Sequence, residues 1–187
     1  NATLVITGPA IAAAFTSDDR IVRLSAALLI SRMNDDHRNA LAKTLAGDPR
    51  ALMWFHMGRC LRAPLQSVPA AGVAANVLVS PTSSSEDRCD AARILQMTLG
   101  DVGPAKDRPV MFDGYAPRLT LASLERELNP IMTKVAAAFP SGDAHLDHEL
   151  IRLVAMTTPF NRELFARLLS SIPASTPPPP HIHSPPA

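Results

Sequence analysis

The sequence predicts an all-α fold, a single domain of about eight short helices with an extended arm at each end. Hydrophobic residues make up 47% of the chain and charged residues 19%, proportions typical of a folded protein. Alanine and leucine are abundant, which favours helices, and 18 prolines against 8 glycines favour many short helices over a few long ones. We therefore divide the chain into an N-terminal arm (1–15), a helical domain (16–173) and a proline-rich tail (174–187).

The N-terminal arm is expected to be extended. It contains the β-branched stretch TLVIT and then Gly8-Pro9, a turn signal. This apolar stretch is too short to span a membrane and lacks the basic leader of a signal peptide, and no later stretch reaches a membrane-spanning length. The sequence therefore predicts no membrane partner, and a location in the cytoplasm or in a virion.

Thr16 begins the first expected helix, because TSDD supplies an N-cap followed by acids at the positive end of the helix dipole. Ile21, Leu24 and Leu28 mark a broad apolar face, which continues to about Met33.

Cap signals define the next two helices. Asn34 begins a helix that ends at Gly47. Asp48-Pro49, a cap followed by proline at the first helical position, begins a third helix, which ends at Pro64. The third helix is apolar nearly all round, which predicts a central place in the fold.

Residues 65–84 mix prolines and small residues, and we expect an irregular connection with one short strand at 77–79. A fourth helix follows, capped by Ser85 and ended by Gly100. Residues 101–119 hold three prolines and two glycines and are expected to form a long loop.

The last third of the chain predicts four more helices. Thr120 caps a short one, and Asn129-Pro130 repeats the cap-plus-proline signal that begins a helix ending near Phe139. The next helix begins near His145, and Thr158-Pro159 begins the last. No repeat of constant period is present, so the sequence does not predict a regular solenoid, although an irregular helical array remains open.

The sequence HLDHE at 145–149 is the strongest candidate for a metal site. His145 and His148 are three residues apart and share a helix face, so both can reach one ion. Zinc proteases space their histidines differently and use a third ligand that is missing from this pattern. We interpret HLDHE as a helix start, and we predict no metal, no cofactor and no catalytic residues, hence no enzyme.

Arginine is the dominant basic residue, although the formal net charge is only +1. Arg88 and Arg93 lie in SEDRCDAAR, near acids on the same expected helix. One interpretation is an exposed face joined by salt bridges; the other is a pair of arginines that contact phosphates while the acids orient them.

The segment from residue 128 to residue 165 resembles part of the coat proteins of tobamoviruses and related rod-shaped plant viruses. The resemblance rests on Glu149-Leu150-Ile151-Arg152, on Phe160-Asn161-Arg162 and on Leu128-Asn129-Pro130-Ile131. It implies a helical bundle that polymerises around single-stranded RNA, with arginines near the inner radius. For a protein of this kind we expect Arg88, Arg93 and Arg162 to contact the RNA. Too few residues follow Phe139 to hold that family's RNA-contacting segment at the place where it is expected.

Two functions follow from these observations. The first is a non-enzymatic structural protein that self-associates, as a coat or nucleocapsid subunit that packages single-stranded RNA. The alternative is a monomeric helical adaptor or scaffold that binds a partner protein, since a proline run can dock on an aromatic-lined groove. The residues expected to contact another subunit or a partner are Phe160, Asn161, Pro177, Pro178, Pro179 and Pro180.

Overall fold

The computed structural model describes residues 8–62, 68–99 and 125–157, together with Ala166 and Ser170. Within these residues the chain forms eight α-helices and no strand, which confirms the all-α fold. The helices are α1 (Gly8–Thr16), α2 (Arg20–Ile30), α3 (Asp35–Leu45), α4 (Pro49–Arg62), α5 (Val68–Val79), α6 (Ser85–Thr98), α7 (Glu125–Ala137) and α8 (Ala144–Thr157).

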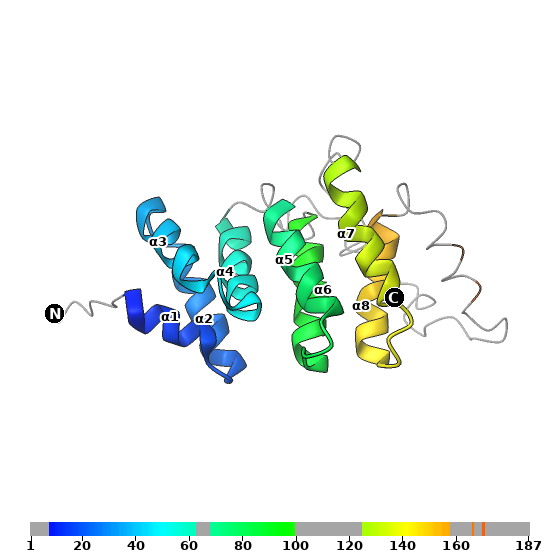
Figure 1. Ribbon diagram of the computed structural model, residues 1–187, viewed down its shortest axis with the longest axis horizontal. Coiled ribbons are helices and arrows are strands. Elements are labelled where there is room, and N and C mark those ends of the chain that lie inside the picture. Colours follow the sequence, from blue (N-terminus) through cyan, green and yellow to red (C-terminus); the bar gives the residue numbers. More distant parts are fainter. Residues whose placement is uncertain (1–7, 63–67, 100–124, 158–165, 167–169, 171–187) are drawn as a thin grey trace, which may run out of the picture.

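The helices lie side by side in an elongated row, with α1, α2 and α3 at one end and α7 and α8 at the other (Figure 1). The even-numbered helices contact one another in order: α2 packs on α4, α4 on α6, and α6 on α8. Helices α1 and α5 lie against this layer, and α7 packs on α5. The arrangement is an irregular array of helices around one continuous apolar core.

Helix α4 occupies the centre, as its apolar sequence predicts. It contacts α1, α2, α3, α5 and α6, and buries Met53, Trp54 and Phe55. The carboxylate of Asp48 accepts a hydrogen bond from the backbone N–H of Ala51 at 3.0 Å, which confirms the predicted N-cap.

Residues 8–15 belong to a helix of the fold, so the expectation that they form part of an extended arm was wrong. Residues 8–16 form α1, whose Ile11 and Phe15 are buried. The ring of Phe15 meets that of Phe55 edge to face, with 6.2 Å between centroids. The next helix starts only at Arg20, where the N-cap is Asp19 and not Thr16. An aromatic contact distant in sequence thus orders a stretch in which local signals favour an extended arm.

The irregular connection and short strand expected within residues 65–84 are corrected by α5. This helix is buried on nearly all sides, and its core positions are alanines together with Val77 and Leu78. It packs against α4, α6 and α7. Burial on several sides suits both small and β-branched side chains, so tertiary packing overrides the strand propensity of residues 77–79.

Two helix starts also differ from the expected ones. Ser84, and not Ser85, is the N-cap of α6: its Oγ accepts a hydrogen bond from the N–H of Asp87 at 3.1 Å. Helix α7 runs through Pro130 and does not begin there. The proline lies in the first half of this helix, where its missing N–H removes only the bond to the carbonyl of Arg126.

Several expectations lie outside the described residues. They concern residues 1–7 of the N-terminal arm, the helix starts at Thr120 and Thr158-Pro159, the long loop at 101–119 and the tail at 174–187.

Candidate functional site

The outer face of α2 is apolar and exposed. Ile21 is 64% exposed and Leu28 52%, while Val22 and Leu29 are each 38% exposed. At helical spacing these four side chains form one stripe, opposite the positions that α2 buries against α4. The first apolar face that the sequence predicts, marked by Ile21 and Leu28, is therefore the face that points away from the core.

Arg23 belongs to the face of α2 that points inward. Its side chain is almost fully buried, and its guanidinium lies 5.4 Å from the centroid of the Trp54 ring. One nitrogen donates to the carbonyl oxygens of Ser17 and Asp18, at 2.8 and 2.9 Å, and another lies 3.7 Å from Asp87 Oδ1. A buried arginine needs such partners, and this orientation of α2 places Trp54 and Asp87 beside it.

Arg20 fastens the start of α2 to α6. Its guanidinium donates two hydrogen bonds to Asp90 Oδ1, at 2.8 and 3.2 Å, and one to Oδ2 at 3.0 Å. Asp90 is buried, and Glu86 lies 3.7 Å from Arg20 Nε. The hydrogen bond to Asp90 raises the pKa of Arg20 above its ordinary value. The contacts of Arg23 and Arg20 thus fix the position of α2, the helix that carries the exposed stripe.

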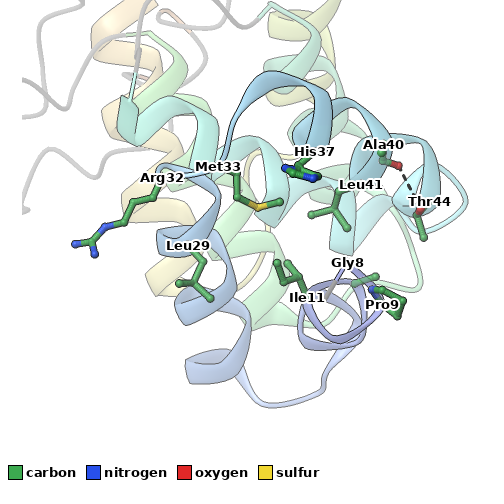
Figure 2. A pocket seen from close by; sticks show the side chains of 11 residues that line it. Gly8, Pro9, Ile11, Leu29, Arg32, Met33, His37, Ala40, Leu41 and Thr44 are labelled. Atoms are coloured by element: carbon green, nitrogen blue, oxygen red, sulfur yellow. Dashed lines mark hydrogen bonds between the residues drawn. The ribbon is translucent and has the colours of Figure 1, made fainter. Parts of the chain in front are cut away.

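A groove of about 850 Å³ runs beside the end of α2 (Figure 2). Helices α1 and α3 form its other walls, with Ile11 and Leu41 among the apolar side chains that line it. Leu29 and Arg32 belong to its rim, so the groove and the exposed stripe of α2 form one continuous surface. Figure 2 shows the side chain of Arg32 pointing away from the other lining residues.

Arg88 and Arg93, the two described candidates for RNA contact, are both used within the fold. Arg88 donates to the carbonyl oxygen of Ser80 at 2.9 Å. Arg93 Nε donates to Glu149 Oε1 at 3.2 Å, although about half of its side chain is exposed. The other predicted contacts, Arg162, Phe160, Asn161 and Pro177 to Pro180, lie outside the described residues.

Glu149 joins α6 to α8. Its Oε2 accepts hydrogen bonds from Gln96 at 2.8 Å and from Arg152 at 3.2 Å, and its Oε1 accepts the bond from Arg93. Burial acts to raise the pKa of Glu149, but the hydrogen bonds from Gln96 and Arg93 and the charge of Arg152 outweigh it, so the pKa is lowered. Arg93 therefore forms a salt bridge, but with Glu149 of α8 and not with the acids of SEDRCDAAR. Two of those acids, Asp87 and Asp90, face Arg23 and Arg20 of α2 instead.

HLDHE begins α8, as the sequence predicts. Asp143 precedes the helix, and its Oδ1 accepts hydrogen bonds from the N–H groups of His145 and Leu146, at 2.9 and 3.3 Å. The Ser85 hydroxyl also donates to Asp143, and these bonds lower the pKa of its carboxyl. His145 and His148 are exposed. Across the ranges that the structure describes, no three histidines, cysteines or acids come together in a way that could hold a metal ion.

Sequence reasoning missed the exposed stripe because α2 is apolar on both sides. A usable signal was the pair of small residues Ala26 and Ala27, since Gly58 of α4 lies against the backbone of Ala27. Small residues that face one another mark the side on which two helices approach closely, and the bulkier stripe then faces outward.

Comparison with protein-family models, with curated proteins and with solved structures finds no match to this chain. The resemblance to coat proteins of rod-shaped plant viruses therefore stays a prediction. None of the helices in the described ranges combines the length and the apolar character that a membrane crossing requires.

Proposed function

We propose that this chain is a non-enzymatic structural protein that self-associates through the exposed stripe of α2. The observation that carries the proposal is the exposure of Ile21, Val22, Leu28 and Leu29 together on one helix face. Single exposed apolar residues are ordinary, but a contiguous stripe at helical spacing is typical of a protein-interaction surface. The contacts of Arg20 and Arg23 hold α2 in place, so the stripe is available without rearrangement of the fold.

Replacing Leu28 by glutamate tests this proposal. Leu28 is half exposed, so Leu28→Glu leaves the core intact while placing a charge in the centre of the surface. In sedimentation velocity runs from micromolar to millimolar concentration, the parent protein is expected to shift from monomer to a larger species. The variant is expected to stay monomeric.

Val79→Glu is the matched control. Val79 is an apolar residue of α5 with 39% exposure, and α5 is distinct from the α2 stripe. This variant should associate like the parent protein. A parent protein that stays strictly monomeric at millimolar concentration would contradict self-association.

A strict monomer would favour the second candidate function, a helical adaptor that binds a partner protein. The groove between α1, α2 and α3 is the observation that supports it, because its lining is concave and largely apolar. Packaging of single-stranded RNA stays a prediction. The contacts of Arg88 and Arg93 within the fold add no support to it.

A further inference from the structure

The exposed residues of α2 are arranged symmetrically along the helix, with an apolar pair on each side of a central serine. Ser25 lies at its middle, exposed between the apolar pairs Ile21-Val22 and Leu28-Leu29. We propose that two copies of this chain dock through α2 in antiparallel orientation, across a two-fold axis that passes near Ser25. The inference rests on the self-association proposed above and specifies its geometry.

The apolar side chains are complementary under this symmetry. Ile21 and Leu29 are equally distant in sequence from Ser25, and so are Val22 and Leu28. An antiparallel two-fold therefore places Ile21 against the partner's Leu29, and Val22 against the partner's Leu28. Each contact occurs twice, as a two-fold interface requires, and every residue of the stripe finds an apolar neighbour.

Ser25 suits the crossing point of the two helices. It is the small residue of the exposed face, which lets the helix axes approach closely. Its hydroxyl donates a hydrogen bond to the carbonyl oxygen of Ile21 at 2.8 Å. The polar atom at the centre of the interface is thus already satisfied within its own helix and does not require water.

Charges at the two ends of the face select the antiparallel orientation. Asp18, whose side chain is 98% exposed, precedes α2, and the exposed Arg32 follows it. Asp18 lies seven residues before Ser25 and Arg32 seven residues after it, so the two charges flank the face at equal separation in sequence. Antiparallel docking brings Asp18 against the partner's Arg32 at both ends, whereas parallel docking would bring like charges together.

The intramolecular contact of Asp18 is compatible with this pairing. Its carboxylate accepts a hydrogen bond from Arg50 at 3.1 Å, and a carboxylate can accept bonds from two guanidinium groups. Antiparallel docking also sets the two helix dipoles against each other in the favourable sense. The four apolar side chains of each copy bury a modest area, so we expect micromolar affinity.

Disulfide cross-linking tests the position of the axis. Ser25→Cys, made in a Cys89→Ala background so that only the buried Cys60 remains, should form a covalent dimer under mild oxidation. Thr133→Cys is the matched control, since Thr133 is exposed on α7 at the far end of the row (Figure 1). It should remain monomeric on a non-reducing gel.

Charge reversal tests the orientation. Asp18→Arg and Arg32→Asp should each weaken dimerisation in sedimentation equilibrium by about tenfold, because each converts two attractive pairs into two repulsive ones. The double variant Asp18→Arg/Arg32→Asp should restore the affinity of the parent protein. Arg126→Glu, an exposed change on α7, should have no effect and serves as the control.

The outcomes separate the two proposals. Restoration by the double variant together with cross-linking through Ser25→Cys supports the two-fold interface. If the parent protein associates and Leu28→Glu abolishes the association, but charge reversal and Ser25→Cys have no effect, the antiparallel geometry is wrong and self-association stands. If a different protein and not a second copy occupies the stripe, the parent protein sediments as a monomer, and both proposals fall.

Discussion

His56 is a nearly buried histidine of α4 whose Nδ1 has no hydrogen-bond partner within the described residues. Burial, aided by the nearby charge of Arg59, lowers its pKa from 6.5 to about 4. The fold therefore holds His56 neutral at a pH where the unfolded chain would protonate it. An unpaired buried nitrogen also costs stability in its own right.

This histidine makes stability fall in weak acid. Above pH 6.5 both states are neutral at His56, so the residue adds no pH dependence. Between pH 6.5 and about 4 only the unfolded state takes up the proton, so the free energy of unfolding decreases as the pH falls. The full loss from this group is about 3 kcal/mol, and it levels off below the folded pKa.

Replacing His56 by leucine is expected to flatten this part of the stability profile. Urea denaturation at several pH values between 4 and 7 measures it, as the difference in slope between His56→Leu and the parent protein. Carboxylates such as Glu149 also lose stabilising contacts in acid, so the difference and not the total slope is diagnostic. His145→Gln, an exposed change, is the control. Equal slopes for His56→Leu and the parent would contradict the assigned role.

At the scale of single residues, side-chain polarity does not show which side of α2 is buried. Ile21 is more apolar than Arg23, yet Arg23 is inside and Ile21 outside. The choice depends on Trp54 and Asp87, which come from α4 and α6. Partners so distant in sequence leave no trace in the polarity of α2 itself, where the small residues Ala26 and Ala27 are the one local sign of the buried side.

At the scale of helices, the packing of α2 on α4 depends on Gly58. A Cβ atom at this position would press into the carbonyl group of Ala27 and lie 3.0 Å from Ile30 Cβ. The obstacle is backbone, which cannot move aside as the end of a flexible side chain could. Glycine normally weakens a helix, so its presence here is explained by the close approach that it allows.

Gly58→Ala is therefore expected to lower the free energy of unfolding by about 2–3 kcal/mol, despite the better helix propensity of alanine. Gly72→Ala is the matched control within α5, where an added Cβ meets nothing within 4 Å. It should raise stability by about 0.5–1 kcal/mol. Thermal denaturation of the two variants measures both effects. Similar melting temperatures for the two would contradict close packing at Gly58.

Helix boundaries were predictable where the signal is local. Asn34 and Asp48 cap α3 and α4 through their own side chains, at positions that the sequence predicts. Helices α1 and α5 were not predicted, because Phe15 and the alanines of α5 are ordered by contacts with α4 and α6. Residues that gain their structure from distant packing carry weak signals within any short window of sequence.

At the scale of the whole molecule, a two-fold contact through α2, at one end of the row of helices, predicts a closed dimer and not a polymer. A two-fold contact uses the same surface on both copies, so docking through α2 leaves no equivalent surface open, and assembly stops at two chains. A rod-shaped coat needs a different kind of contact, in which one end of the row binds the other end of the next copy. The far end of this row is formed by α7 and α8, which are unlike α2 in sequence.

We therefore expect the assembly to saturate at a dimer. Light scattering across a concentration series should give a mass that levels off at twice that of one chain, and negative-stain images should show no rods. The melting temperature should rise with protein concentration in the parent protein and stay constant in Leu28→Glu, because dimer formation stabilises the folded chain by mass action. Added single-stranded RNA should leave the mass unchanged. Rods that form on adding RNA would contradict the closed dimer, and would favour the coat-protein role that the segment from residue 128 to residue 165 predicts.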